Sequence, residues 1–239
     1  MGASFKTTLD VVGPMMKISG GTLLDAALGR LTRQASDDRI AWWGAEVVRR
    51  TGMDLRVEGR EHVAGTETFV VMSNHQSHID IPILFAAVSP RLRMVTKKEL
   101  FRVPIWGKAM RESGFIEIDR QNRERAIESL RVAKETLRSG VHVWIAPEGT
   151  RSRDGVMLPF KKGGFMTALD SDTRILPVGV SGTRDVLPKG HAKAKAGQCI
   201  AVVIGTPIDV TGKDRDTLMV ETRSAIEALV KRADTLRAA

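Results

Sequence analysis

A cluster of polar side chains interrupts an apolar stretch at residues 70–85, VVMSNHQSHIDIPILF. Two of these side chains, His75 and Asp80, have the chemistry of a general base and of the acid that orients it. A carboxylate bound to one imidazole nitrogen fixes the tautomer and leaves the other nitrogen free to accept a proton. We expect His78 to be a polar residue of the first helical turn rather than a second base.

The spacing of His75 and Asp80 restricts how the two side chains can meet. On a continuous helix, a separation of five residues turns a side chain by about 140°, so the two would not share a face. They meet if His75 lies in a loop and a helix begins between them. Ser77 is a suitable N-cap for that helix, and Pro82 falls in its first turn, where a missing N–H is tolerated.

Two other interpretations of this cluster stay open on spacing alone. His75, His78 and Asp80 are residue types that bind metals, but the other three histidines of the chain have no recognisable ligand spacing. The prediction therefore includes no metal. The cluster is also compatible with a turn that only caps the next helix.

A second cluster, PEGTRSR at residues 147–153, has the composition of an anion-binding loop. Gly149 lets the backbone approach a ligand, Thr150 supplies a hydroxyl, and the fork of Arg151 grips a phosphate at two points. Glu148 would orient Arg151 or another cation, or accept a substrate hydroxyl. Further positive charge comes from Lys97, Lys98, Arg120, Lys161 and Lys162. A solvated basic loop is the alternative, and the Gly-Lys-Ser/Thr pattern of nucleotide-triphosphatase loops is missing.

Together, a base, an orienting acid and an anion grip indicate activation of a hydroxyl on a phosphorylated substrate. Covalent catalysis is disfavoured, because the chain has no Gly-x-Ser-x-Gly motif and its one cysteine, Cys199, has no neighbouring base. The electrophile must then arrive already activated. A thioester fits, because a thiol with a pKa of about 8.5 leaves as the thiolate without a strong general acid.

The elements that must position these clusters follow an α/β pattern from residue 52 onward. Short apolar and β-branched runs, typical of buried strands, occur at residues 69–73, 92–96, 115–118, 141–146, 175–180 and 199–204. Helical stretches lie between several of them, the clearest at 122–139 and 215–236. Strands alternating with helices predict a largely parallel central sheet flanked by helices. Because ligands bind beyond the carboxyl ends of such strands, the polar clusters found there would form one site.

Residues 1–50 differ from the catalytic domain that we predict at 51–239. Their apolar side chains recur at helical spacing and predict two amphipathic helices, broken near Ser36 and Asp37. These helices would pack on the main domain, insert into a lipid interface, or do both with different faces. No uncharged stretch approaches the roughly 20 residues that cross a bilayer. We expect a peripheral or monotopic protein on the cytoplasmic face of a membrane, without a transmembrane helix.

The charge balance limits the class of partner. Lys and Arg number 37 against 28 acids, a formal net charge of +9, which favours anionic partners. Tyr is absent and aromatic residues make up 5% of the chain, which disfavours a platform that stacks nucleic-acid bases. We therefore predict an anionic membrane surface and no nucleic acid. A non-catalytic basic module that binds membrane or nucleic acid is the alternative.

Four motifs resemble those of the glycerolipid acyltransferases, especially the 1-acyl-sn-glycerol-3-phosphate (lysophosphatidic acid) acyltransferases. NHQSHID resembles the Asn-His-x-x-x-x-Asp motif of that family. GFIEIDR at 114–120, PEGTRSR at 147–153 and ILPVGVSG at 175–182 are similar to its other three blocks. The motifs occur in family order across residues 52–206. One departure is Ala146, which replaces the aromatic residue usually found before Pro-Glu-Gly.

The resemblance implies acyl transfer from acyl-CoA or acyl carrier protein to the free sn-2 hydroxyl of 1-acylglycerol 3-phosphate, giving phosphatidic acid, with no cofactor besides the acyl thioester. Another lysolipid acceptor is the alternative. His75 would be the base and Asp80 its partner. The residues implied to bind the acceptor's phosphoglycerol end are Arg120, Glu148, Gly149, Thr150 and Arg151, with Lys97 or Lys98. Those implied to shape the site are Asn74, Ser77 and Pro177. The implied partners are the two substrates and, as an alternative donor, acyl carrier protein.

Overall fold

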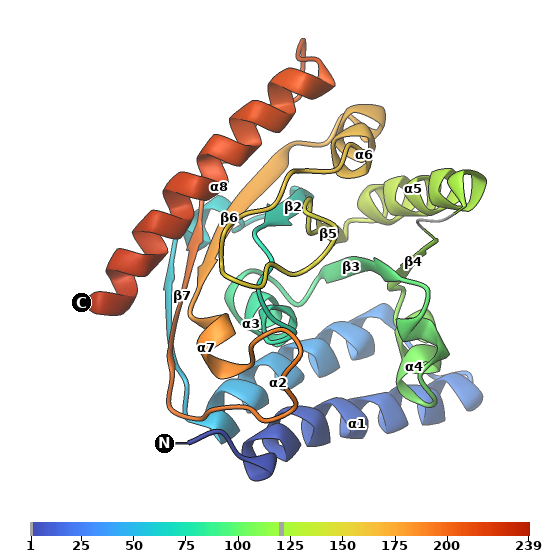
Figure 1. Cartoon of the computed structure of the whole chain (residues 1–239). Helices are drawn as coiled ribbons and strands as arrows, with labels where there is room; N and C mark the ends of the chain where they lie inside the picture. The colour runs from blue at the N-terminus through green and yellow to red at the C-terminus, as the bar shows by residue number, and fades with distance from the viewer. Residues whose placement is uncertain (1, 120–121) are drawn as a thin grey trace.

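A seven-stranded sheet forms the centre of the protein, in a computed structural model that describes residues 2–119 and 122–239 (Figure 1). The strand order is β1-β7-β6-β2-β5-β3-β4, and every neighbouring pair is parallel except β6 and β7. The strands are β1 (Asp54–Glu58), β2 (Val70–Ser73), β3 (Leu92–Lys97), β4 (Ile116–Ile118), β5 (His142–Ile145), β6 (Ile175–Ser181) and β7 (Cys199–Ile204). The predicted, largely parallel sheet is confirmed.

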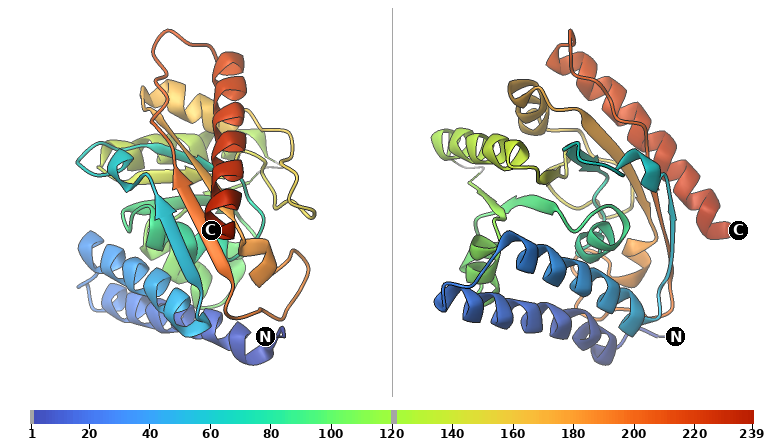
Figure 2. Two further views of the ribbon diagram at one scale, coloured as in Figure 1. Left: turned by 90° about the vertical axis from the view of Figure 1, so that its left-hand side faces the viewer. Right: turned by 180° about the vertical axis from the view of Figure 1, so that it is seen from behind.

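Helices cover both faces of this sheet (Figure 2). One face carries α1 (Phe5–Ala27), α2 (Arg33–Thr51), α3 (Asp80–Ala87) and α4 (Trp106–Glu112). The other carries α5 (Arg123–Arg138), α6 (Gly163–Ser171) and α8 (Arg215–Ala238). Three short helices lie in connections: η1 (Arg60–His62), η2 (Leu100–Arg102) and α7 (Thr183–Val186).

The two-sided cover explains why the central strands are continuously apolar. Successive side chains of a strand point to opposite faces of the sheet. In β2, Val71 joins the core under α2 and α3, whereas Val70 and Met72 join the core under α5, α6 and α8. Both faces of the strand are therefore buried, as expected for a parallel sheet.

The break between the two N-terminal helices lies at residues 28–32, not near Ser36 and Asp37 as predicted. The Thr32 hydroxyl accepts a backbone N–H from the first turn of α2 and so marks its start. Ser36 and Asp37 are buried inside this helix, and Asp37 forms an ion pair with Arg93 of β3. The contact with Arg93 thus stabilises Ser36 and Asp37 inside a helix, although two such residues in sequence usually favour a helix end.

The helix α2 is part of the main hydrophobic core. Its Trp43 and Val47 are buried with residues of α3. At Gly44 the two helices come so close that a Cβ would lie 2.8 Å from the carbonyl oxygen of Pro82. The helix α1 packs in turn on α2 and α4. Within the part of the chain that the structure describes, no helix combines the length and apolar composition needed to cross a membrane.

Candidate active site

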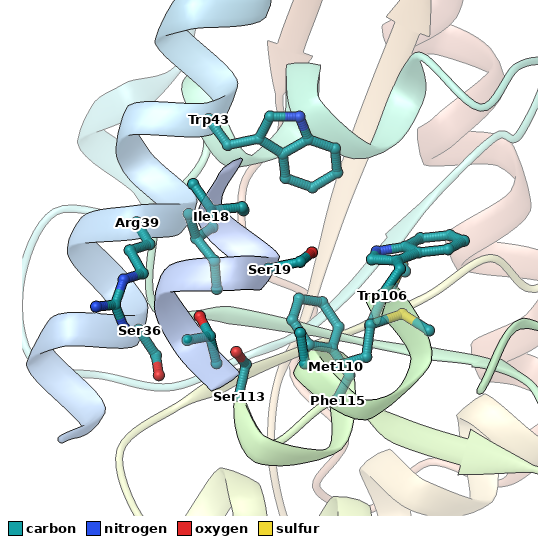
Figure 3. A pocket seen from close by; sticks show the side chains of 13 residues that line it. Ile18, Ser19, Ser36, Arg39, Trp43, Trp106, Met110, Ser113 and Phe115 are labelled. Atoms are coloured by element: carbon teal, nitrogen blue, oxygen red, sulfur yellow. The ribbon is translucent and has the colours of Figure 1, made fainter. Parts of the chain in front are cut away.

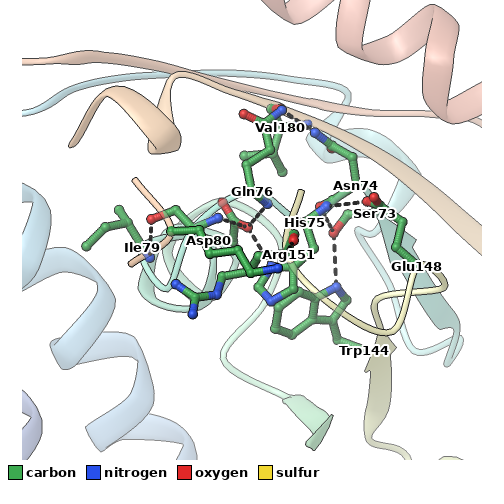
Figure 4. Close-up of polar contacts among 12 residues, drawn as sticks. Ser73, Asn74, His75, Gln76, Ile79, Asp80, Trp144, Glu148, Arg151 and Val180 are labelled. Atoms are coloured by element: carbon green, nitrogen blue, oxygen red, sulfur yellow. Dashed lines mark hydrogen bonds and ion pairs between the residues drawn. The ribbon is translucent and has the colours of Figure 1, made fainter. Parts of the chain in front are cut away.

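The loop between β2 and α3 begins with Asn74, whose side chain fixes it to β6. Its Nδ2 donates to the carbonyl oxygen of Val180 and its Oδ1 accepts the N–H of the same residue, each at 2.8 Å (Figure 4). The amide therefore continues the pairing of β2 and β6 beyond the end of β2. This places the next residue, His75, at the carboxyl end of the central strand.

The predicted N-cap role of Ser77 is wrong. The helix α3 begins at Asp80, with Ile79 at the cap position and no side-chain cap hydrogen bond. The Ser77 hydroxyl instead donates to the carbonyl oxygen of Leu187 at 2.7 Å and accepts the N–H of Ile79 at 3.1 Å. The hydrogen bond to Leu187 joins the loop to the segment after α7.

One carboxylate oxygen of Asp80 accepts three hydrogen bonds from the loop. Its Oδ2 accepts Nδ1–H of His75 at 2.6 Å and the backbone N–H groups of Gln76 at 2.8 Å and Ser77 at 3.0 Å (Figure 4). The side chain is fully buried, and its Oδ1 has no hydrogen-bond partner in the described part of the chain. It lies in the first turn of α3, at the end of the helix where its backbone N–H groups point.

The contact with Asp80 defines the tautomer of His75. An ionised carboxylate only accepts hydrogen bonds, so Nδ1 carries the proton and Nε2 has a free lone pair. The imidazole meets the Trp144 ring edge to face, with 5.6 Å between centroids. The His75 side chain is 16% exposed, and its Nε2 has no hydrogen-bond partner among the described residues. This nitrogen can accept a proton.

Glu148 is turned toward the protein backbone. Its Oε1 accepts the N–H of His75 and its Oε2 accepts the N–H of Leu158, each at 2.8 Å. The side chain is buried, and this burial raises the pKa of its carboxyl, while the two backbone N–H groups act in the opposite direction. The N–H of Ser152 also donates to the carbonyl oxygen of His75 at 2.8 Å. The loop at 147–153 therefore holds both backbone polar groups of His75.

A cavity of about 210 Å³ opens in front of the imidazole. Its polar lining includes His75, His78, Lys97, Gly149, Thr150 and Arg151. Burial lowers the pKa of Arg151, but a guanidinium stays charged at neutral pH. His75 and two cations thus face one space, an arrangement that suits a reaction on a hydroxyl beside an anionic group.

Two other predicted residues, Lys98 and Pro177, do not line this cavity. Lys98 forms an ion pair with Asp119 at 2.7 Å. Pro177 lies within β6, opposite Met72, and does not line this cavity. Arg120 lies outside the described residues. Among residues 2–119 and 122–239, no three His, Cys, Asp or Glu side chains gather into a group that could hold a metal ion.

Sequence reasoning did not identify Lys189 or Trp144 as parts of the site. The Lys189 ammonium donates to the carbonyl oxygen of Arg151 at 2.6 Å and to the Thr150 hydroxyl at 3.2 Å. No motif surrounds this lysine, so no sequence signal could have found it. The place of Trp144 follows from the pairing of β5 with β2, since its Nε1 donates to the Ser73 hydroxyl at 3.0 Å.

Comparison with known proteins identifies the family. A family model described as Acyltransferase matches residues 54–181, more than half of the chain. The protein belongs to the acyltransferase family, and the resemblance inferred from the four motifs is confirmed.

The curated proteins that resemble this chain are named as 1-acyl-sn-glycerol-3-phosphate acyltransferases. The chain is 34% identical over 166 residues to 1-acyl-sn-glycerol-3-phosphate acyltransferase alpha of Homo sapiens, covering 69% of this chain and 58% of that protein. It is 33% identical over 173 residues to a chloroplastic 1-acyl-sn-glycerol-3-phosphate acyltransferase of Arabidopsis thaliana, covering 72% and 48%. The matched region thus spans about half the length of these curated relatives.

A solved structure matches almost the whole chain. The crystal structure of the 1-acyl-sn-glycerophosphate acyltransferase PlsC from Thermotoga maritima aligns with a TM-score of 0.82 and 29% sequence identity. The alignment covers 95% of this chain and 94% of that one. The helices α1 and α2 therefore belong to the shared fold together with the sheet.

Proposed function

We propose that this protein transfers a fatty acyl group from acyl-CoA or acyl carrier protein to the sn-2 hydroxyl of 1-acylglycerol 3-phosphate, forming phosphatidic acid. The observation that carries the proposal is the 2.6 Å contact between His75 and Asp80 at a cavity that also contains Lys97 and Arg151. The names of the similar proteins support the same acceptor.

The reaction uses His75 first as a base and then as an acid. Nε2 takes the proton of the acceptor hydroxyl while its oxygen attacks the thioester carbonyl carbon. The new C–O bond forms a tetrahedral intermediate, which collapses by breaking the C–S bond. The departing thiolate then takes the proton from the imidazolium. Asp80 stays ionised, holds the ring in place and stabilises its positive charge.

The acceptor's phosphate suits the cations beside the base. The Arg151 fork binds two phosphate oxygens, and the Lys97 ammonium adds a point charge. The backbone at Gly149, which has a φ of +72°, lets the loop turn tightly toward the ligand. Lys189 holds the loop through Thr150 and the Arg151 carbonyl, so that these donors are in place before substrate binds.

We assign the membrane contact of the protein to the exposed face of α1. Phe5, Leu9, Val12 and Met16 are exposed and follow helical spacing along one stripe. An exposed apolar stripe on a surface helix is typical of a helix that lies in a lipid interface. With the net charge of +9, this supports peripheral attachment through residues 1–50 to an anionic bilayer.

Two further apolar residues are exposed just before α4, a helix that packs on α1. Val103 is 40% and Ile105 48% exposed. Ile105 is the centre of a γ-turn with φ +66° and ψ −63°, closed by Trp106 N–H donating to the Pro104 carbonyl at 2.7 Å. We take this strained conformation of a β-branched residue as support for a functional role of Ile105 at the proposed membrane contact.

The test is acyl transfer by the full chain on vesicles that contain an anionic phospholipid. Lysophosphatidic acid is supplied with oleoyl-CoA or oleoyl-acyl carrier protein, and free thiol and phosphatidic acid are measured together. We expect both products in equal amounts. Lysophosphatidylcholine, glycerol 3-phosphate and lyso-ornithine lipid serve as competing acceptors. Thiol release without lipid product, or a preference for the acceptor that lacks a phosphate, would contradict the proposal.

A further inference from the structure

The proposed reaction places negative charge on the oxygen of the thioester carbonyl. When the acceptor oxygen attacks the carbonyl carbon, the electron pair of the C=O double bond moves to this oxygen. The pair returns when the C–S bond breaks. Hydrogen-bond donors that meet the oxygen in between lower the barrier, and the loss of one such donor typically costs about 10²–10³ in kcat. A donor with this role must face the same cavity as His75.

The backbone N–H groups nearest to the His75 imidazole already have acceptors. The N–H of His75 itself donates to Glu148, and those of Gln76 and Ser77 donate to Asp80. These three groups fix the loop in place and are therefore not free to meet a substrate.

The unpaired N–H groups of Arg39 and Trp43 lie in a different part of the protein. Nη1 of Arg39 and Nε1 of Trp43 are buried and have no hydrogen-bond partner within residues 2–119 and 122–239. Both residues line a cavity of about 30 Å³ between α1, α2 and α4, and His75 is not part of its lining (Figure 3). That volume holds one or two water molecules. These donors therefore suit a buried water and not a thioester.

His78 differs from these groups because its side chain faces the active-site cavity. It lies in the turn before α3, three positions after His75, and lines the cavity of about 210 Å³ together with His75, Lys97 and Arg151. The residue is exposed, and its imidazole makes no hydrogen bond to any residue that the structure describes. Neither the proposed base nor the proposed phosphate contacts use this side chain.

The His78 imidazole is neutral at neutral pH. An imidazole with the usual pKa of about 6.5 is mostly uncharged above pH 7. At His78 burial lowers the pKa to about 4, and the positive charge of Arg151 acts in the same direction. A neutral imidazole has one N–H group, which can polarise a substrate carbonyl by donating a hydrogen bond to it.

We propose that the imidazole of His78 donates a hydrogen bond to the thioester carbonyl oxygen and stabilises the oxyanion of the tetrahedral intermediate. The inference rests on the proposed acyl transfer. No proton is transferred in this contact, because His75 alone takes the proton of the acceptor hydroxyl and returns it to the thiolate. The two imidazoles thus act on different substrates, His75 on the acceptor and His78 on the donor.

The first test replaces His78 with side chains that keep or remove the N–H donor. Acyl transfer from oleoyl-CoA to lysophosphatidic acid is measured for His78→Leu, His78→Asn and His78→Gln. We expect kcat to fall by about 10²–10³ in His78→Leu. The amide N–H of Asn lies near the place of Nδ1 and that of Gln near the place of Nε2, so one of these two variants should recover a large part of the loss. His191→Leu, at an exposed position outside the cavity, should keep the wild-type rate.

A second readout separates a contact with the oxyanion from a contact with the acceptor's phosphate. In His78→Leu, the KM for lysophosphatidic acid should stay near the wild-type value, because the lost interaction is made only in the transition state. Arg151→Ala should instead raise this KM, since it removes a proposed phosphate contact. The two variants are compared at a saturating concentration of oleoyl-CoA.

The inference would be overturned by a wild-type kcat in His78→Leu, or by an increase in KM as the main effect of that variant. A loss of kcat that neither amide variant reduces would also overturn it. Circular dichroism checks the fold of each variant. If His78→Leu does not fold, His78→Ala removes the same donor and is judged by the same criteria. A wild-type protein that forms no phosphatidic acid would instead count against the proposed acyl transfer itself.

Discussion

Glu148 holds the backbone of His75, although 73 positions separate the two residues in sequence. The Glu148 Oε1 accepts the His75 N–H at 2.8 Å, while Oε2 accepts the N–H of Leu158. The loop that carries the proposed phosphate-binding side chains therefore also fixes the proposed base, His75. A carboxylate that looks in sequence like a substrate contact serves in the structure to position another residue.

Glu148→Gln should weaken both the fold and the reaction. The amide oxygen can accept one N–H, but the amide NH₂ then faces the other N–H, which stays buried and unpaired at a cost of about 1–3 kcal/mol. We expect a lower midpoint in urea unfolding and a loss in kcat larger than the change in KM. The matched control is Glu61→Gln, because Glu61 is exposed. A Glu148→Gln protein as stable and active as wild type would show that the backbone bonds do not position His75.

The ion pair of Asp37 with Arg93 should anchor the N-terminal helices to the sheet. Both side chains are buried, and the Arg93 guanidinium lies 2.6 Å from the Asp37 carboxylate. Asp37→Ala leaves this cation without its counter-ion, and we expect a loss of about 3–5 kcal/mol in the free energy of unfolding. Glu58→Ala removes an exposed pair with Arg232 and should change stability little. If the two variants lost the same free energy of unfolding, the buried ion pair would stabilise the fold no more than the exposed one.

His142 should make the fold sensitive to acid. Burial lowers the pKa of this imidazole to about 4, and its Nδ1 accepts the N–H of Phe69. The unfolded chain takes up the proton near pH 6.5 and the folded chain only near pH 4. Stability is therefore complete above pH 6.5 and falls as the pH drops from 6.5 to 4, by up to about 3 kcal/mol.

The test of this prediction is urea unfolding at pH 7 and pH 4.5. In His142→Asn, the amide oxygen can replace Nδ1 as an acceptor without titrating, so the difference between the two pH values should shrink. His191→Asn, at an exposed position, should leave that difference unchanged. An undiminished pH effect in His142→Asn would assign the acid sensitivity to other groups.

The apolar stripe of α1 should control membrane attachment. Phe5→Ser with Leu9→Ser removes two side chains that are 64% and 68% exposed. We expect co-sedimentation with anionic vesicles to fall strongly while the thermal midpoint stays unchanged, because neither side chain contributes to the core. Val220→Ser, at a position 69% exposed on α8, is the matched control. Unchanged vesicle binding would place the lipid contact elsewhere.

The sequence predicts the central elements because their signals are local. The strands from β2 to β7 coincide with apolar runs, and the contact between His75 and Asp80 follows from a helix start between them. The strand β1 is not predicted, because its residues 54–58 alternate charged and apolar side chains next to β7 alone. An edge strand of this kind lacks a continuous apolar signal.

The remaining differences depend on tertiary contacts. Ser36 and Asp37 look like a helix end until Arg93 is known to lie beside them. Ser77 is not the N-cap, because its hydroxyl donates to the Leu187 carbonyl. The direction in which Glu148 turns depends on two backbone groups distant in sequence. Local patterns could not supply these three contacts.

The most direct test of the account is single-turnover acyl transfer by His75→Ala and Asp80→Asn beside the wild type. The substrates are oleoyl-CoA and lysophosphatidic acid, and circular dichroism checks the fold of each variant. We expect both variants to fold and to lose about 10²–10⁴ in rate, because one lacks the base and the other lacks the charge that orients it. A folded His75→Ala protein that forms phosphatidic acid within about tenfold of the wild-type rate would contradict the assignment of the base.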